Sequence, residues 1–418
     1  MIEIFKKLKK YNYWNKNKIK TGFVRNIYLK RIKKYIDNNL IKVLIGQRRV
    51  GKSYILRQII QELINNKVNP KNIFYLNKEM VDFDEIKNYK DLKRLIDFYK
   101  KELKVRGKIY ILLDEVQEIN QWEKIVNSLS QNYKNKYEIF LTGSNSKLLS
   151  GELATYLSGR YVCFDIFPFS FNEYTKYFNI FKNKDNFLDY LKIGGLPELY
   201  KLKDEETKNH YISSLRDTIL LKDIVQRYKI KDAYLLERIF KFLIDNIGNL
   251  FSINSVVNYL NSHKIKTNFE TVANYVNYLV QSFLIYEVER FDLKGKAILL
   301  GGKKYYLNDL SFKNYLSSSF DYGLGKHLEN AIYIHYRLLG YKIYVGKIAE
   351  KEVDFIIEKD KEKKYIQVAY NLLDKKVIER EFSGLEKIQD AYEKVVISLD
   401  DVSFGNKNGI KHLLAWEI

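Results

Sequence analysis

Residues 42–53 read Lys-Val-Leu-Ile-Gly-Gln-Arg-Arg-Val-Gly-Lys-Ser and decide how the first part of the chain folds. The apolar run is short and ends at Gly46, which is typical of a buried strand that runs into a loop. Apolar side chains then recur at helical spacing over 52–65. The residues from Gly46 to Ser53 fit the pattern G-x-x-x-x-G-K-[ST], and the strand–loop–helix context that this pattern requires is met. The stretch predicts a phosphate-binding loop, with an ordinary glycine turn as the alternative.

The residue types in this loop suit the phosphates of a nucleotide. Glycine allows backbone N–H groups to turn toward an anion, and the positive end of the following helix faces the same way. Lys52 is expected to contact the β- and γ-phosphates, and the Ser53 hydroxyl to bind Mg²⁺. ATP and Mg²⁺ are therefore the expected cofactors. The predicted nucleotide-binding residues are Gly46, Gln47, Arg48, Arg49, Val50, Gly51, Lys52, Ser53 and Tyr54.

A second signal comes from the strands that follow. Four are predicted, with helical patterns among them, at 72–77, 108–115, 137–144 and 161–166. Alternating strands and helices favour a parallel sheet. The strand 108–115 is apolar until it ends in Asp114 and Glu115. Asp114 is predicted to complete the shell of the Mg²⁺ ion, and Glu115 to polarise the attacking water. The alternative is an acidic pair at a helix N-terminus.

Polar residues after the next strand are weaker candidates. Thr142, Ser144 and Asn145 stand where a side chain could hold the attacking water or the γ-phosphate, although a plain turn is the alternative for each. Of these, Asn145 is the predicted catalytic residue. Transfer of a γ-phosphoryl group also calls for an arginine. Arg160 is the candidate, either in cis or from a neighbouring subunit. A surface arginine paired with an acid is the alternative.

The pattern changes after residue 200. Helices are predicted at 208–228, 234–247, 252–262 and 268–281, and two strands at 283–290 and 303–309. Three helices followed by a β-ribbon is the order of a winged helix. A polar stretch, 317–325, marks a boundary. Beyond it the order is helix (326–339), three strands (341–346, 352–357 and 363–369), helix (378–392) and strand (394–398).

Several motifs occur in a familiar order: GQRRVGKS (46–53), YILLDEVQ (110–117), LTGSNSKLLS (141–150), LSGRY (157–161), FPFSFNEY (167–174) and GGLPE (194–198). Together they resemble a prokaryotic family of AAA-type ATPases, frequent in archaea, whose members carry a C-terminal uncharacterised domain with a restriction-endonuclease-like fold. The resemblance implies an AAA-type P-loop parallel sheet and a C-terminal α/β nuclease-like domain, with the helical and winged-helix region between them. It also implies that FPFSF and GGLPE couple the ATP state to the downstream domains.

The expected boundaries place a basic N-terminal segment at 1–23, the ATPase domain at 24–200, the helical and winged-helix region at 201–316 and the nuclease-like domain at 317–418.

By resemblance, Glu329 and Asp354 match acidic positions of the nuclease-like fold. The next strand should read like E-x-K, but here it reads Gln367-Val368-Ala369. Glutamine does not replace a carboxylate as a strong Mg²⁺ ligand. The expectation is therefore a degenerate site at Glu329, Asp354 and Gln367, with Glu352 nearby. A metal-dependent nuclease is the alternative, and acids that merely pair within a folding module are another.

The composition excludes several other classes of protein. The 418 residues are 46% hydrophobic and 15% aromatic, too much for a disordered chain. No apolar run is long enough for a membrane span, the N-terminus lacks a secretory signal, and a single cysteine, Cys163, excludes an internal disulfide. A cytoplasmic location is expected.

The net charge of +21 favours nucleic acid as a partner, although a Lys- and Asn-rich coding bias explains it equally well. Residues 1–42 hold thirteen lysines and arginines against two acids, Glu3 and Asp37, for a net charge of +11. With Tyr11, Tyr13 and Trp14 interleaved, this segment is expected to form a basic arm that contacts nucleic acid or an acidic partner. A solvated lead-in helix is the alternative.

The sequence therefore predicts an ATP-hydrolysing AAA-type enzyme that acts on or near nucleic acid, with a protein partner or a homo-oligomer also open and no membrane. The alternatives are an ATP-regulated DNA nuclease and a nucleotide-dependent protein-interaction switch.

Overall fold

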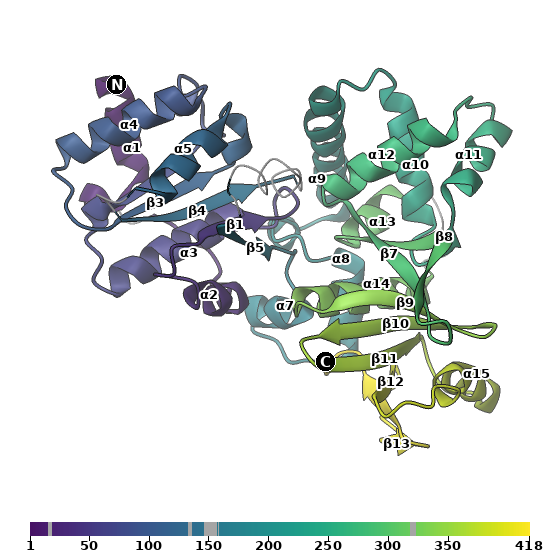
Figure 1. Ribbon diagram of the computed structural model, residues 1–418. Coiled ribbons are helices and arrows are strands. Elements are labelled where there is room, and N and C mark those ends of the chain that lie inside the picture. Colours follow the sequence, from purple (N-terminus) through teal and green to yellow (C-terminus); the bar gives the residue numbers. More distant parts are fainter. Residues whose placement is uncertain (16–18, 133–135, 146–156, 158, 318–322) are drawn as a thin grey trace. The chain divides into compact units, whose positions relative to one another are not determined.

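The computed structural model describes residues 1–15, 19–132, 136–145, 157, 159–317 and 323–418. Within these residues the chain forms two compact units, Met1–Ile166 and Phe167–Ile418 (Figure 1). Each unit has its own sheet and is described by itself. Residues 146–150 of the LTGSNSKLLS motif, Ser158, and most of the boundary stretch 317–325 lie outside the described residues.

The first unit is built on a five-stranded parallel sheet, as the alternation of strands and helices predicted. Its strands, in the spatial order β2-β3-β4-β1-β5, are β1 (Ile41–Ile45), β2 (Ile73–Asn77), β3 (Ile109–Asp114), β4 (Tyr137–Gly143) and β5 (Tyr161–Asp165). Every residue of β1 to β4 is buried, as expected for parallel strands covered on both faces. A P-loop-type α/β sheet is thereby confirmed.

Helices surround this sheet: α1 (Ile2–Tyr11), α2 (Asn26–Lys33), α3 (Lys52–Asn65), α4 (Tyr89–Glu102) and α5 (Trp122–Ser130). The helix α3 follows the loop that the sequence singled out, and its buried face carries the apolar residues at helical spacing. The helix α4 begins at a capping box, in which Asn88 and Asp91 satisfy each other's backbone N–H groups.

The N-terminal segment covers an edge of the sheet. The strand β2 is an edge strand, and the Asn12 side chain bonds both backbone groups of Tyr75: its amide donates to the carbonyl at 2.9 Å and its oxygen accepts from the N–H at 2.8 Å. The Trp14 indole donates to the Ile73 carbonyl at 2.7 Å and its ring stacks on Tyr99. These bonds take the place of a neighbouring strand and satisfy groups that would otherwise invite pairing with another chain.

The prediction of a basic, aromatic-interleaved arm is therefore wrong for its aromatic side chains. Tyr13 and Trp14 are each only 7% exposed, and Tyr11 donates a hydrogen bond to Asp82 at 2.8 Å. The rings belong to the core because burying their large apolar surface within the unit stabilises the fold. The solvated lead-in helix is not the full answer either, since one face of α1 packs into the unit.

The second unit contains many helices, including those that the sequence predicted after residue 200. They are α7 (Phe171–Phe178), α8 (Lys184–Ile193), α9 (Glu205–Thr218), α10 (Ala233–Asp245), α11 (Ile253–Ser262), α12 (Phe269–Gln281), α13 (Ser311–Leu316), α14 (Leu324–Leu338) and α15 (Lys375–Glu386). A π-helical stretch, Ile219–Gln226, continues α9. No helix in the described part of the chain combines the length and apolar character needed to cross a membrane.

A nine-stranded mixed sheet runs through this unit in the order β13-β14-β12-β11-β10-β9-β7-β8-β6. Its strands are β6 (Leu250–Phe251), β7 (Ile285–Asp292), β8 (Ala297–Leu307), β9 (Lys342–Ile348), β10 (Lys351–Lys359), β11 (Glu362–Ala369), β12 (Glu393–Ser398), β13 (Asn406–Lys407) and β14 (Ile410–Leu414). The helix–three strands–helix–strand order from α14 to β12 agrees with the order predicted from the sequence, which did not include β13 and β14.

The two downstream regions expected as separate domains share this one sheet. The strand β7 pairs parallel with β9, from Arg290 opposite Val345 to Asp292 opposite Lys347. The first compact unit also ends at Ile166, ahead of the expected limit at residue 200. Local patterns identify a strand but not its neighbour, because pairing between distant segments depends on the whole fold.

The Asn12→Ala variant should be destabilised by about 2–4 kcal/mol, because it leaves two buried backbone groups of β2 without a partner. Urea unfolding measures this loss. The matched control is Lys6→Ala, an exposed position on α1, which should change stability by less than about 0.5 kcal/mol. Equal stabilities of the two variants would contradict the role assigned to Asn12.

Candidate active site

The loop between β1 and α3 needs its glycines. A Cβ atom on Gly46 would lie 2.2 Å from the Ile166 carbonyl oxygen, so a larger residue does not fit. Gly51, the N-cap of α3, has a φ of 97°, a conformation that L side chains avoid. Arg49 also adopts a positive φ, of 67°. The backbone is thus wound tightly in front of the α3 N-terminus, which is the arrangement that binds phosphate.

Lys52 lies folded into this loop. Its side chain is 4% exposed, and its ammonium donates to the carbonyls of Gly46 at 2.9 Å and Gln47 at 3.0 Å. The same ammonium is 3.5 Å from Oε1 of Glu115. The loop, the lysine and the predicted catalytic carboxylate are therefore brought together, as the sequence anticipated.

Asp114 ends β3 and is fully buried. Its Oδ1 accepts from the Thr142 hydroxyl at 2.5 Å, its Oδ2 accepts from the Tyr75 hydroxyl at 2.9 Å, and Ser53 also hydrogen-bonds to it. Burial and the adjacent Glu115 carboxylate raise the pKa of Asp114 more than these hydrogen bonds lower it.

The side chains present fit Mg²⁺. The ion prefers hard oxygen ligands, and the Ser53 hydroxyl and the Asp114 carboxylate supply them side by side at the helix N-terminus.

Glu115 has a φ of 52°, unusual for a residue other than glycine, and is 4% exposed. Burial opposes its ionisation, but the Lys52 ammonium and the Gln117 amide outweigh burial and lower the pKa of Glu115. The Gln117 amide donates to its Oε2. Glu115 is therefore an ionised carboxylate held on both oxygens, which suits a group that polarises water.

The three polar candidates at the end of β4 and just after it have different surroundings in the structure. Thr142 bridges the two acids: its hydroxyl accepts from the Glu115 N–H at 2.9 Å and donates to Asp114. Ser144 lies 3.4 Å from the Gln117 amide. Asn145 is 1% exposed, at the end of the described β4 segment. Of the three, the sequence favoured Asn145 as a catalytic residue, and that role stays a prediction.

Two polar side chains that contact the acids were not predicted from the sequence: Tyr75 on β2, which bonds to Asp114, and Gln117 in the turn after Glu115, which bonds to Glu115. Tyr75 lies within an apolar strand, so nothing marks it as polar machinery. Gln117 follows the acids by two residues, and this spacing was the one available signal.

Arg160 is not brought to the loop. Its carbonyl accepts from the Ile41 N–H at 2.9 Å, at the amino end of β1, whereas the loop follows the carboxyl end of that strand. The five residues of β1 span about 13 Å between these ends. Arg160 is exposed, so the in-cis role is not supported and only the role from a neighbouring subunit stays a prediction.

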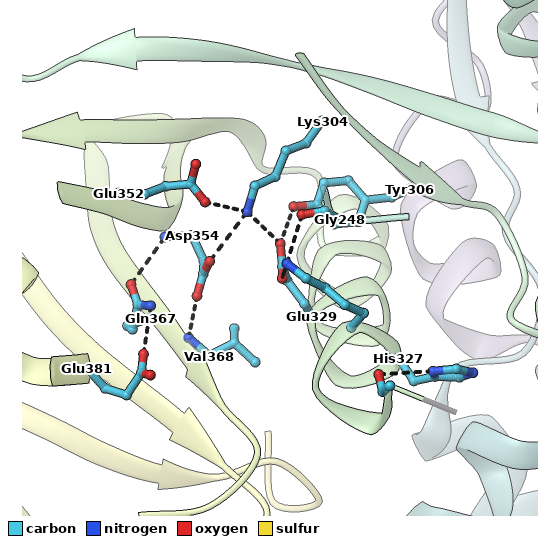
Figure 2. Close-up of polar contacts among 12 residues, drawn as sticks. Gly248, Lys304, Tyr306, His327, Glu329, Glu352, Asp354, Gln367, Val368 and Glu381 are labelled. Atoms are coloured by element: carbon cyan, nitrogen blue, oxygen red, sulfur yellow. Dashed lines mark hydrogen bonds and ion pairs between the residues drawn. The ribbon is translucent and has the colours of Figure 1, made fainter. Parts of the chain in front are cut away.

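The carboxylates predicted for the degenerate nuclease-like site lie together in the second unit, with a lysine at their centre. The Lys304 ammonium lies 2.9 Å from Glu329, 2.6 Å from Glu352 and 3.5 Å from Asp354, and Figure 2 draws these three contacts as dashed lines. Gln367 accepts from the Asp354 N–H at 3.3 Å and donates to Glu381. No signal in the sequence connected Lys304 with these acids, because it comes from β8, in the region expected as a winged helix.

Two ammonium groups face the three carboxylates of this cluster, because Lys326 also pairs with Glu329 at 2.9 Å. Lys304 is 2% exposed, and although burial disfavours its charge, Glu329, Asp354 and Glu352 raise its pKa. Burial and Glu329 raise the pKa of Asp354 to about 7. Among the described residues no set of three His, Cys, Asp or Glu side chains has the geometry of a metal site. The Lys304 ammonium lies among the three carboxylates.

With this geometry established, comparisons place the chain among known proteins. Residues 38–175 match a family model described as an AAA domain, and residues 184–322 match a domain of unknown function (DUF8612). The first unit thus carries an AAA-type ATPase domain.

An uncharacterised protein of Haemophilus influenzae is 35% identical over 379 residues, covering 90% of this chain and 92% of that protein. Another of Methanocaldococcus jannaschii is 32% identical over 382 residues, covering 87% and 81%. The chain belongs to the family of these two proteins.

Solved structures are more distant. The Aeropyrum pernix ORC1 protein in complex with DNA is 12% identical, with 71% of this chain and 93% of that chain covered and a TM-score of 0.32. Cdc6p from Pyrobaculum aerophilum is 11% identical, with 63% and 86% covered and a TM-score of 0.30. Similarity at this level carries no argument about this chain.

The Lys304→Met variant should lose about 3–5 kcal/mol of stability at pH 8, because it removes the charge that compensates three carboxylates. Without Lys304 the pKa of Asp354 rises further, and a carboxyl whose folded-state pKa is raised destabilises most above that pKa. The loss should therefore shrink as the pH falls from 8 toward 4, as measured by urea unfolding.

The neighbouring Lys303→Met variant is the control, since Lys303 is partly exposed and forms an ion pair with the partly exposed Glu287; it should lose at most about 1 kcal/mol. A pH-independent loss in Lys304→Met would contradict the electrostatic account.

Proposed function

We propose that the first unit binds and hydrolyses ATP with Mg²⁺. The observation that carries this is the convergence of the Lys52 ammonium, the Ser53–Asp114 pair and the ionised Glu115 at the carboxyl ends of adjacent parallel strands. The AAA domain match over residues 38–175 supports it.

Each side chain has a distinct task. The loop N–H groups and Lys52 bind the phosphates. Ser53 and Asp114 would hold Mg²⁺, which when bound neutralises phosphate charge. Glu115 draws a proton from the attacking water toward one of its Oε atoms, because its carboxylate stays charged beside Lys52. Thr142 holds Asp114 and the Glu115 backbone in register.

Two variants separate binding from turnover. Lys52→Ala should weaken ATP binding severely, whereas Glu115→Gln should bind ATP and turn it over at least about 100-fold more slowly, because it lacks the base. Binding of a fluorescent ATP analogue and phosphate release measure the two. Glu118→Gln, an exposed acid in the same turn, is the matched control and should match the wild type.

Hydrolysis by Lys52→Ala at the wild-type rate would overturn the site assignment. Tight ATP binding by the wild type without any turnover would favour the nucleotide-dependent switch instead.

We infer a route by which the nucleotide state reaches the second unit. The loop residue Gly46 packs against Ile166, the last residue of the first unit, and the FPFSF segment follows directly. Within the second unit, the Phe169 N–H donates to the Gly195 carbonyl at 2.7 Å, and the Gly195 N–H donates to Asp309 at 2.7 Å. These contacts give FPFSF and GGLPE a fixed attachment, which supports the coupling role that the resemblance implied.

We propose nucleic acid as the partner of the second unit, through a winged-helix-like part. The order α10, β6, α11, α12, β7, β8, with β6 paired to β8 beside β7, supports this reading. Exposed lysines lie where such a part contacts phosphates: Lys264 and Lys266 before α12, and Lys294 and Lys296 between β7 and β8. These lysines replace the N-terminal arm as the expected contact.

The C-terminal part, with its helix–three strands–helix–strand order, is proposed to be a restriction-endonuclease-like module that does not cleave. The support is Lys304, whose ammonium occupies the middle of the carboxylates that a metal would need. An ATP-regulated nuclease is therefore the less supported alternative.

Mutating Lys264, Lys266, Lys294 and Lys296 together to alanine should weaken binding of duplex DNA and reduce the salt slope of log K by about 3–4, because up to four phosphate contacts are lost. Fluorescence anisotropy over a salt series measures this. The control, Lys101→Ala with Lys104→Ala, removes exposed lysines of the first unit and should keep the slope.

Plasmid DNA should remain intact in the same samples with Mg²⁺ or Mn²⁺, with or without ATP. An unchanged slope in the fourfold variant would contradict the proposed winged-helix contact. Metal-dependent nicking that is lost in Asp354→Ala would favour the nuclease instead.

A further inference from the structure

Gln117 lies within the proposed hydrolytic site, and its side chain has one partnered and one unpartnered end. It belongs to the 3-10 turn Val116–Glu118, which begins directly after Glu115. The left-handed backbone of Glu115, with a φ of 52°, reverses the chain there and brings the glutamine side chain back toward the strand ends. A non-glycine residue adopts this conformation at an energetic cost, which the surrounding contacts must offset.

The amide end of Gln117 holds the carboxylate that the proposed mechanism uses. Its Nε2 donates to Oε2 of Glu115 and lies 3.4 Å from the Ser144 hydroxyl. The Lys52 ammonium is on the other oxygen, Oε1, at 3.5 Å. Both carboxylate oxygens therefore have a fixed neighbour, and rotation of the Glu115 carboxylate is restrained from two sides.

The oxygen end of Gln117 is different. Its Oε1 is buried and has no hydrogen-bond partner among the described residues. Leaving a buried acceptor unsatisfied costs about 1–3 kcal/mol, so such an atom calls for a donor. Turning the amide around does not remove the problem, because Oε1 would then face Oε2 of Glu115, placing two acceptors against each other.

We propose that Gln117 is a positioning residue for ATP hydrolysis: its amide aims the Glu115 carboxylate, and its Oε1 accepts a hydrogen bond from the attacking water. The inference rests on the proposed ATPase function and adds a residue to it. A water held this way has its second proton directed at Glu115, so the oxygen lone pair is free to attack phosphorus. The water proton passes to Glu115, and the bond between the γ-phosphorus and the bridging oxygen breaks as the new P–O bond forms.

This role makes a specific kinetic prediction. Gln117→Met keeps the size of the side chain but removes both the donor and the acceptor, so kcat should fall at least about tenfold, whereas KM for ATP and binding of a fluorescent ATP analogue should stay within about twofold. The split between kcat and KM distinguishes positioning from a general structural role. The matched control is Gln121→Met, an exposed glutamine of the same connection, which should leave both constants unchanged.

A second variant covers the case in which Gln117→Met does not fold, as judged by its thermal unfolding midpoint. Gln117→Glu is nearly isosteric and keeps an acceptor, but it loses the donor and sets a second carboxylate against Glu115; its kcat should also fall at least about tenfold with KM retained.

The outcomes are distinct. A wild-type protein that hydrolyses ATP, together with a folded Gln117→Met or Gln117→Glu variant of wild-type kcat, overturns the inference and leaves the ATPase function standing. A rise in KM with kcat unchanged also overturns it, since Gln117 would then contribute to nucleotide binding. A wild-type protein that binds ATP without hydrolysing it overturns both proposals.

Discussion

The first unit depends on the in-register parallel pairing of its central strands. With Ile45 opposite Gly143 and Leu113 opposite Leu141, the carboxyl ends of β1, β3 and β4 fall at one edge of the sheet. That single constraint sets the phosphate-binding loop, the Asp114–Glu115 pair and the polar end of β4 beside one another. A shift of one residue would turn each side chain to the opposite face and dissolve the site.

A buried polar network secures that edge. Thr142 joins the backbone of Glu115 to the carboxylate of Asp114, and Tyr75 supplies the second bond to Asp114. Burial and the Asp114 carboxylate keep the pKa of Tyr75 well above its usual value, so its hydroxyl remains a donor. Since β2 carries Tyr75 and is an edge strand, its cover by Asn12 and Trp14 matters to the site as well as to the fold. The N-terminal segment thus bonds to the backbone of the strand whose Tyr75 side chain contacts Asp114.

In the second unit, strand pairing likewise brings side chains from distant parts of the chain together, and here these side chains are charged. Its long sheet joins the β7–β8 ribbon to the C-terminal strands, and this continuity brings Lys304 to Glu329, Glu352 and Asp354. The ammonium and the carboxylates satisfy one another, so the cluster is coherent as a structural ion network. The resemblance to nuclease-like proteins correctly predicted that these acids lie close together. Lys304, which pairs with them, comes from β8 and was not part of that prediction.

The sequence by itself determined the features written in local spacing: the glycine loop with Lys52 and Ser53, the apolar strand that ends in Asp114 and Glu115, and the alternation that produces a parallel sheet. Local spacing suffices for these because glycine conformation, strand burial and helix periodicity act over a few residues. Only the tertiary structure decided that Trp14 belongs to the core, that Arg160 lies at the opposite end of β1, and that Lys304 fills the C-terminal cluster. Each of these depends on which strand pairs with which, and that choice is made by burial and hydrogen bonding between residues far apart in the chain.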